Sequence, residues 1–265
     1  MGTRRQPGDR TRLLLTRSRL VRAGRIPQWA STTNEFAGWL PASSPLTGRA
    51  SLRWVNVYLV GAKNPETRRQ ILAQQAANQD WRMAGFVDND PALQGTEVWG
   101  WPVLGGFDVV PDLVAHDPDA FFVNLVTGFP QARHEVGESL DLMGCRLTNL
   151  IHPSVDLTDV EVGVGIYVQD GVFIQAGAKI ADNVAINVGS VVAHESSIAR
   201  STFLAPMVTV AGEVEIGRGV FVGAGACITP LMVIGDWAII GAGAVIIRNV
   251  ESGTTVVGTG RVLSP

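Results

Sequence analysis

A strict six-residue repeat of aliphatic side chains constrains this chain more than any other feature. From Val162 to Ile246, every sixth residue is Ile, Val or Leu, and fifteen positions in succession obey the rule. The residue that follows is often small, as at Gly163 and Ala181. An α-helix repeats every 3.6 residues and a plain strand every two, so neither produces a strict six. A hexapeptide repeat is typical of a parallel β-helix, in which each hexad forms one short strand and one bend.

The repeat also predicts the geometry of the β-helix. The aliphatic residue of each hexad points into the prism. In most hexads a second, small or β-branched residue four positions later also points inward, and the other side chains face outward. With three hexads to a coil, the fifteen hexads make about five coils, about 24 Å tall at about 4.8 Å per paired strand. Residues 18 apart therefore lie one above the other. We expect Gly and Ala at bends where a larger Cβ does not fit or where the backbone needs unusual dihedral angles.

Charge is distributed unevenly over the 265 residues, whose net charge is −3. Residues 1–53 hold ten Arg but only one Asp and one Glu, a charge of +8, and the rest of the chain carries −11. An acidic folded part argues against nucleic acid as the main partner. No apolar run approaches the roughly 18 residues that span a membrane. Cys145 and Cys227 have neither metal-site nor disulfide spacing, so we expect a cytoplasmic protein.

The Arg-rich residues 1–53 show no sustained hydrophobic period. We interpret them as a disordered extension, because such a composition cannot bury enough apolar surface to fold. The alternative is a targeting peptide or an arm that contacts an anionic surface.

Residues 54–152 alternate between strand and helix signals. Strands are predicted at 55–60, 83–87, 121–126 and 146–151, an edge element at 98–104, and helices at 64–78, 106–116 and 131–143. Strands that alternate with helices indicate a small parallel sheet, so we expect a Rossmann-like domain in residues 54–152. The dipeptide His152-Pro153 marks the junction. The β-helix domain then takes residues 153–265.

This combination of a small α/β domain, a Leu-Ile-His-Pro junction, a hexapeptide prism and a terminal Val-Val-Gly segment resembles a group of bacterial sugar acetyltransferases. The group comprises the sialic acid O-acetyltransferases and the UDP-4-amino-sugar N-acetyltransferases. The resemblance covers residues 55–262. It implies a left-handed β-helix, a homotrimer, and acetyl-coenzyme A as co-substrate in grooves between neighbouring prisms. It implies no metal.

His194 is the only histidine in residues 155–265. It lies two positions after Val192, off the inward positions, so its ring is expected to face outward. Acetyl transfer from a thioester needs a base that takes a proton from an amine or hydroxyl, and histidine is the usual choice. In the family that the chain resembles, a histidine followed by an acid at this point is the catalytic pair. The resemblance thus implies His194 as general base and Glu195 as its support; the alternative is a solvated histidine on an outer wall.

Gly212 lies 18 residues after His194, hence one coil further along the prism. Its backbone N–H is a candidate donor to the oxyanion of a tetrahedral intermediate, and the resemblance also places a contact with the acetyl group there. The alternative, a bend glycine, is compatible with this role. The resemblance places coenzyme contacts at Phe203, Gly212, Ala224 and Ala242. Some family members have His where this chain has Phe203.

The resemblance assigns the sugar nucleotide to the α/β domain, through a glycine-rich loop after the first strand. Here residues 61–66 read Gly-Ala-Lys-Asn-Pro-Glu, without the later glycines and the histidine of the family, and Pro65 lacks an N–H that would contact phosphate. Lys63 is either a point charge for an anion or an ordinary exposed lysine. Asp88 matches an acidic position of the family or forms a turn. The candidate substrate contacts are Lys63, Asn64, Asp88 and Gly128.

The leading hypothesis is transfer of an acetyl group from acetyl-coenzyme A to an amino or hydroxyl group of a sugar, free or nucleotide-linked, in the biosynthesis of surface polysaccharide or glycan. The alternative is a trimeric scaffold or sensor without catalysis, which the altered loop 61–66 favours and the His194-Glu195 pair opposes. A zinc carbonic anhydrase on the same prism needs three histidines on neighbouring walls, and the single histidine of the repeat excludes it.

Overall fold

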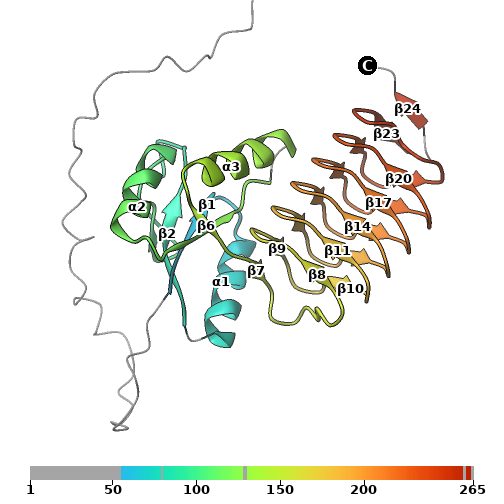
Figure 1. Ribbon diagram of the computed structural model, residues 1–265. Helices are drawn as coiled ribbons and strands as arrows, with labels where there is room; N and C mark the ends of the chain where they lie inside the picture. Colours follow the sequence, from blue (N-terminus) through green and yellow to red (C-terminus); the bar gives the residue numbers. More distant parts are fainter. Residues whose placement is uncertain (1–54, 79, 128–129, 259–260, 264–265) are drawn as a thin grey trace, which may run out of the picture. The chain divides into compact units, whose positions relative to one another are not determined.

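The computed structural model describes residues 55–78, 80–127 and 130–258, together with the backbone of 261–263 (Figure 1). The extension predicted for residues 1–53 and the candidate contact at Gly128 lie outside the described residues. Within them, a small α/β region precedes a left-handed parallel β-helix, which confirms the predicted fold class. None of the helices described is long and apolar enough to cross a membrane.

The α/β region is built on a parallel four-stranded sheet in the order β2–β1–β5–β6. Its elements are β1 (Val55–Val60), α1 (Glu66–Ala77), β2 (Trp81–Val87), β3 (Glu97–Val98), β4 (Trp101–Pro102), the 3₁₀ helix η2 (Phe107–Val109), α2 (Val110–His116), β5 (Phe121–Asn124), α3 (Pro130–Leu142) and β6 (Arg146–Leu147). The last four residues of β1 are all buried. Such a continuous buried run is typical of a central parallel strand that is covered on both faces.

Two predicted elements differ in the structure. The strand predicted at 146–151 divides into β6, which pairs with β5, and β7 (Leu150–Ile151), which pairs with the first coils of the β-helix. The chain therefore leaves one sheet and enters the other within a few residues. The edge element predicted at 98–104 is the hairpin of β3 and β4, because Trp99 and Gly100 adopt positive φ angles of 52° and 88° and reverse the chain.

Each hexad contributes a two-residue strand whose second residue is the predicted aliphatic. These strands are β8 (Glu161–Val162), β9 (Tyr167–Val168), β10 (Phe173–Ile174), β11 (Lys179–Ile180), β12 (Ala185–Ile186), β13 (Val191–Val192), β14 (Ser197–Ile198), β15 (Phe203–Leu204), β16 (Thr209–Val210), β17 (Glu215–Ile216), β18 (Phe221–Val222), β19 (Cys227–Ile228), β20 (Val233–Ile234), β21 (Ile239–Ile240) and β22 (Val245–Ile246). One face continues with β7 before the repeat and with β23 (Thr255–Val257) after it, and β24 (Arg261–Leu263) pairs antiparallel to β23. These additions give about six turns where the repeat alone predicted about five.

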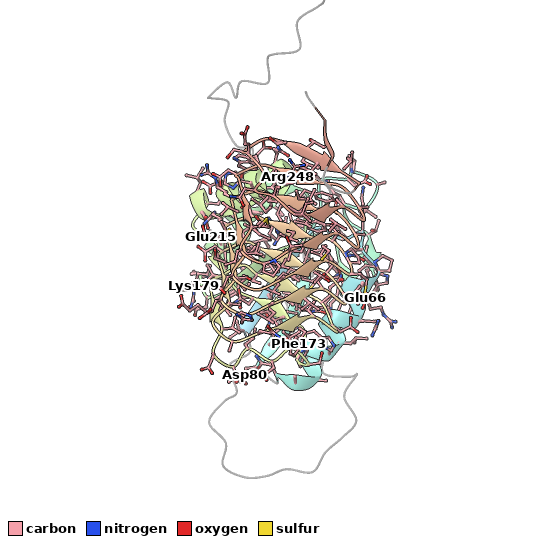
Figure 2. All side chains as sticks on the ribbon, turned by 90° about the vertical axis from the view of Figure 1, so that its right-hand side faces the viewer. Glu66, Asp80, Phe173, Lys179, Glu215 and Arg248 are labelled. Carbon is pink, nitrogen blue, oxygen red and sulfur yellow. The ribbon has the colours of Figure 1, made fainter. Side chains whose placement is uncertain are left out.

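Parallel pairing joins residues 18 apart, as the repeat predicted: Ile198 pairs with Ile180 on one side and with Ile216 on the other. All three side chains are buried, so successive coils share one apolar core. The first residue of each strand points away from this core; most of these residues are at least partly exposed, whereas Tyr167, Ala185 and Phe203 are buried. Lys179 and Glu215 project from the same side of the prism, that of the sheet formed by β8, β11, β14, β17 and β20 (Figure 2).

At each bend, small residues and residues in the left-handed backbone conformation occupy different positions. The left-handed conformation recurs three residues after an inward aliphatic, as at Glu195 (φ 57°) and Glu213 (φ 58°). The small residue directly after the aliphatic instead permits close approach between coils. A Cβ on Gly217 would lie 2.6 Å from the backbone nitrogen of Asp236, a distance that real Cβ atoms do not reach. Tight spacing between coils therefore explains a glycine directly after the aliphatic residue, as at Gly217.

Replacement of one inward aliphatic tests the shared core. We expect Ile198→Ala to lower the free energy of unfolding by about 2–5 kcal/mol, because it opens a cavity between two paired isoleucines. Chemical denaturation followed by circular dichroism measures the change. Ser197→Ala, which alters the outward neighbour in the same strand, serves as the control and should change stability by less than about 0.5 kcal/mol. Equal losses in both variants would contradict the assigned register.

Candidate active site

His194 stands on the edge of the prism between β13 and β14, where the backbone is fixed by both neighbouring coils. Its N–H donates to Oε1 of Gln175 at 2.9 Å, and its carbonyl accepts from the N–H of Glu213 at 3.0 Å. The N–H of Glu195 in turn donates to the carbonyl of Ala176 at 3.3 Å. The imidazole itself is 58% exposed. A rigid backbone thus presents a ring that points outward, as the register predicted.

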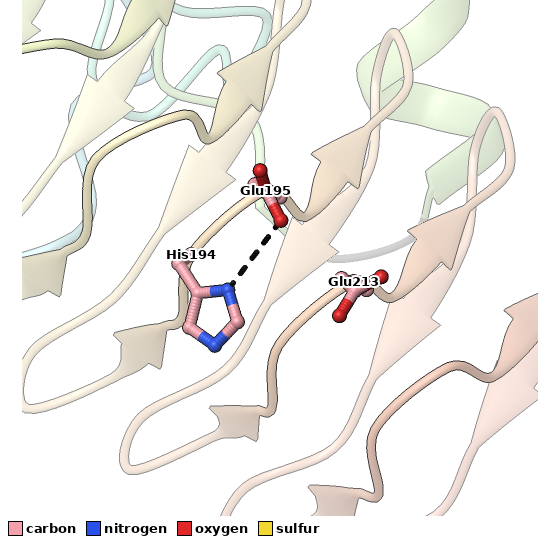
Figure 3. Close-up of side chains that lie close together, drawn as sticks. All are labelled: His194, Glu195 and Glu213. Carbon is pink, nitrogen blue, oxygen red and sulfur yellow. Dashed lines mark ion pairs between the residues drawn. The ribbon is translucent and has the colours of Figure 1, made fainter.

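Two carboxylates lie beside the imidazole (Figure 3). The distance from Nδ1 of His194 to Oε2 of Glu195 is 3.8 Å. Glu213 follows Glu195 by one coil. His194, Glu195 and Glu213 each offer one potential metal-ligand atom, and these three atoms lie within 4.8 Å of one another. All three side chains are exposed, so water weakens their mutual attraction. Within the described residues, these three form the one group whose atom types and spacing suit a metal ion.

Gly212 makes room for the imidazole. A Cβ on Gly212 would lie 2.6 Å from Nε2 and 2.7 Å from Cε1 of His194. Only a glycine therefore lets the ring lie against the backbone of the next coil. In the described part of the chain, no acceptor pairs with the N–H of Gly212. The pair predicted from the 18-residue spacing is thus in direct contact.

A shallow groove of about 460 Å³ runs along the prism beside this edge. It is lined by Lys179, Glu195, Ser197, Glu213, Glu215, Leu231 and Val233. Lys179 forms an ion pair with Glu161 at 3.1 Å, which offsets its charge. The groove is consequently acidic, with an apolar end at Leu231 and Val233.

Apart from Gly212, the residues predicted to contact the coenzyme lie elsewhere on the prism. Ala224 and Ala242 occupy successive bends that follow β18 and β21, and the carbonyl of Ala224 accepts from the N–H of Gly243 at 2.8 Å. Both alanines are exposed. Phe203, on β15, is only 8% exposed and stacks on Phe221 with ring centroids 5.4 Å apart. Within one chain, the structure does not bring these residues to the edge that carries His194.

The predicted substrate residues gather at the carboxyl ends of β1 and β2. Nζ of Lys63 lies 2.8 Å from Oδ2 of Asp90, and this hydrogen-bonded pairing holds the pKa of Asp90 below its usual value and that of Lys63 above it. The two carboxylate oxygens of Asp88 accept from the N–H groups of Ala62 and Asp90, both at 2.9 Å. Asn64 accepts from the N–H of Glu66 at the start of α1 at 3.0 Å. These side chains order the loops that follow β1 and β2.

Sequence reasoning missed two members of these clusters. Glu213 has the signal that identified Gly212, because it lies 18 residues after Glu195. Asp90 had only the general signal of an acidic turn after a strand, and its pairing with Lys63 depends on how two loops meet in space.

Comparison with known proteins gives matches among solved structures only. A scan against protein-family models found no match, and a search of curated proteins found none. A variant of perosamine N-acetyltransferase from Caulobacter crescentus, in complex with CoA and GDP-perosamine, is 28% identical with a TM-score of 0.71, over 79% of this chain and 97% of that chain. The acetyltransferase domain of PglB from Neisseria gonorrhoeae, in complex with acetyl coenzyme A, is 27% identical with a TM-score of 0.67, over 79% of this chain and 100% of that chain.

A third structure, WeeI from Acinetobacter baumannii, shares the fold with a TM-score of 0.67 and 24% identity, over 79% of this chain and 100% of that chain. The matches span nearly the full length of each neighbour, so they include both the α/β region and the β-helix. The chain is therefore similar, in fold and over almost all of its described length, to the hexapeptide-repeat sugar acetyltransferases, which confirms the resemblance drawn from its sequence.

Proposed function

We propose that this protein transfers an acetyl group from acetyl-coenzyme A to an amino or hydroxyl group of a sugar, as a step in the biosynthesis of a surface polysaccharide or glycan. The observation that carries the proposal is the contact of His194 with Gly212 beside Glu195. It occurs in a chain similar to an enzyme that was crystallised with CoA and GDP-perosamine and to a domain crystallised with acetyl coenzyme A.

His194 acts as the general base. The nitrogen or oxygen of the acceptor attacks the thioester carbonyl while His194 takes its proton. The tetrahedral intermediate then collapses, the carbon–sulfur bond breaks, and the leaving thiolate of coenzyme A takes the proton from the imidazolium. Glu195, whose carboxylate lies 3.8 Å from Nδ1, orients the ring and stabilises its charged form.

Gly212 contributes in two ways. Its lack of a side chain lets the imidazole lie against the next coil. Its N–H has no partner in the described part of the chain, which makes it available to the oxyanion that develops on the thioester oxygen. A fixed backbone donor next to the base stabilises that charge without reorganisation.

The acidic groove favours an amino acceptor over a hydroxyl acceptor. The groove contains three glutamates, at positions 195, 213 and 215, but one lysine, Lys179. This lysine forms an ion pair with Glu161. A carboxylate-lined surface attracts an ammonium group and repels phosphate. We therefore propose the sugar end, and not the nucleotide end, of a linked acceptor as the part that reaches His194.

The complete site requires more than one copy of the chain. His194 and the two coenzyme-contact alanines, Ala224 and Ala242, occupy different edges of one prism, so a single groove containing both must form between two prisms. Exposed apolar side chains lie on or next to the sheet formed by β10, β13, β16, β19 and β22. Among them, Phe173 is 57% exposed and Met207 is 64% exposed. We propose a homotrimer, with acetyl-coenzyme A between neighbouring prisms.

A non-catalytic trimeric scaffold or sensor is the alternative function. One observation favours it: the loop after β1 lacks the later glycines of the family pattern, its Pro65 has no N–H for a phosphate, and its lysine is paired with Asp90. Calorimetry with acetyl-coenzyme A separates the two functions. Absence of binding heat with the unmodified protein would favour the scaffold.

Replacement of the base tests the mechanism. We expect His194→Gln to slow acetyl transfer by about 10²–10⁴-fold, because the amide of glutamine cannot take the proton. Thiol release from acetyl-coenzyme A is measured with free 4-amino sugars and with their GDP-linked and UDP-linked forms. The control is His152→Gln at the junction, where the imidazole forms its hydrogen bonds within the described residues with Ser154; this variant should keep full activity. Full activity of His194→Gln would contradict the mechanism.

The contact between coils gives a second test. We expect Gly212→Ala to lower kcat by about 10²-fold, because the new Cβ displaces the imidazole from its position. If Gly212 acts through His194, the double variant Gly212→Ala/His194→Gln should be no slower than His194→Gln alone. Additive losses in this double-mutant cycle would indicate that Gly212 has a separate role.

The proposed homotrimer is tested by measuring the mass of the particle in solution. Sedimentation equilibrium should give a particle of three times 28.2 kDa. Met207→Glu, which places a charge in the exposed apolar border, should shift the particle towards the monomer and reduce thiol release in parallel. A monomer that retains full activity would contradict the shared site.

A further inference from the structure

Arg133, in the first turns of α3, is a fully buried cation without a carboxylate partner in the described residues. Its guanidinium donates instead to four backbone carbonyls. Nε donates to Asn183 at 2.7 Å, Nη1 to Asn124 at 2.9 Å and to Val126 at 3.2 Å, and Nη2 to Val184 at 3.3 Å. Burial lowers the pKa of Arg133 to about 9, while the four acceptors favour the charged form.

The four carbonyls belong to two different parts of the molecule. Asn124 ends β5 and Val126 follows it, both in the α/β region. Asn183 and Val184 form the bend that precedes β12 of the β-helix. One planar side chain therefore joins the segment after β5 to a fixed bend of the prism.

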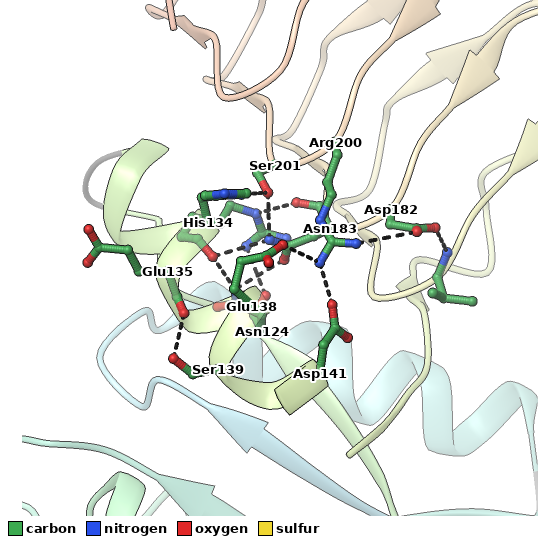
Figure 4. A network of polar contacts seen from close by, with 12 residues as sticks. Asn124, His134, Glu135, Glu138, Ser139, Asp141, Asp182, Asn183, Arg200 and Ser201 are labelled. Carbon is green, nitrogen blue, oxygen red and sulfur yellow. Dashed lines mark hydrogen bonds and ion pairs between the residues drawn. The ribbon is translucent and has the colours of Figure 1, made fainter. Parts of the chain in front are cut away.

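Hydrogen bonds among the side chains of Asn124, Asn183 and Ser201 reinforce this joint (Figure 4). Nδ2 of Asn124 donates to Oδ1 of Asn183 at 3.1 Å, and Nδ2 of Asn183 donates to Oγ of Ser201 at 3.0 Å. A Cβ on Gly137 would lie 2.5 Å from Nδ2 of Asn183, so only a glycine lets α3 approach the prism this closely. The side chains of Asn124, Arg133, Asn183 and Ser201 are all buried at this joint.

Residues 125–127 follow β5 at the carboxyl end of the sheet, beside its switch point. β1 lies between β2 and β5, and the chain runs to opposite sides of β1 to form them. In open parallel sheets, ligands bind at the carboxyl ends of the strands where the order reverses in this way. The N–H of Leu125 donates to the carbonyl of Val60 at 2.8 Å, and a Cβ on Gly61 would lie 3.5 Å from the carbonyl carbon of Leu125. The ends of β1 and β5 thus meet at this point, which we call the β1–β5 switch point.

We infer that Arg133 is a positioning residue for the acceptor: it fixes the β5 side of the β1–β5 switch point to the prism. A nucleotide-linked acceptor bound at the switch point is thereby presented at a set distance from the prism edges, one of which carries His194. The inference rests on the proposed function in taking a nucleotide-linked sugar as the acceptor, and it places that ligand at the switch point.

The test compares two arginines of the same joint. Arg133→Lys keeps the positive charge but cannot reach all four carbonyls with its single nitrogen. Arg200→Ala is the matched control: Arg200 pairs with Glu138 and Asp141 of α3 from the prism side but does not contact the segment after β5. Calorimetry of the full chain measures the Kd of GDP-linked and UDP-linked 4-amino sugars and of coenzyme A. Binding is measured without acetyl transfer, so failure of the proposed chemistry and failure of this inference give different results.

We expect Arg133→Lys to raise the Kd of the nucleotide-linked sugar by about tenfold or more and to leave the Kd of coenzyme A within about twofold. Arg200→Ala should leave both constants within about twofold, even where it lowers Tm. Gly137→Ala, which pushes α3 away from Asn183, should reproduce the selective loss if Arg133→Lys does not fold. Equal losses for both ligands, the same loss in Arg200→Ala, or no binding of either nucleotide-linked sugar by the unmodified protein would overturn the inference.

Discussion

Backbone pairing between successive coils, at a spacing of 18 residues, is the interaction on which the rest of the structure depends. It aligns the aliphatic residues into one core and, by the same register, aligns outward residues into columns. His194 lies against Gly212 because both belong to one column. A single inserted residue between them would turn the following side chains away from their columns. Core stability and the geometry of the candidate site therefore depend on the same hydrogen bonds.

The sequence predicted the repeating features of the β-helix. It could not predict the contacts between the α/β region and the prism, which follow no repeat. The strand positions and the His194–Gly212 contact follow from counting, and Glu213 was within reach of the same argument. The division of the strand predicted at 146–151 was not, because β7 leaves the α/β sheet only when the β-helix offers it a partner. Arg133 reads in the sequence as an ordinary helical arginine. Its burial becomes visible only when α3 lies against the prism.

The prism also separates residues that the proposed chemistry needs together. A coil with three faces places successive bends on three different edges, so the base at His194 and the small residues at Ala224 and Ala242 cannot share a groove within one chain. The proposed chemistry therefore needs more than one copy of the chain. In the proposed homotrimer, a second copy closes the open side of the shallow groove beside His194.

Arg133 and Arg200 show two ways in which a charge can join the same parts of a protein. Arg200 is paired with carboxylates on α3, whose side chains rotate, so its ion pairs tolerate movement of the helix. Arg133 is paired with carbonyls, which belong to the backbone and cannot turn without moving the chain. Burial of a cation is costly, and a well-packed apolar side chain often gives equal or greater stability. An arginine at this position is therefore better explained by the geometry that it enforces than by the stability that it adds.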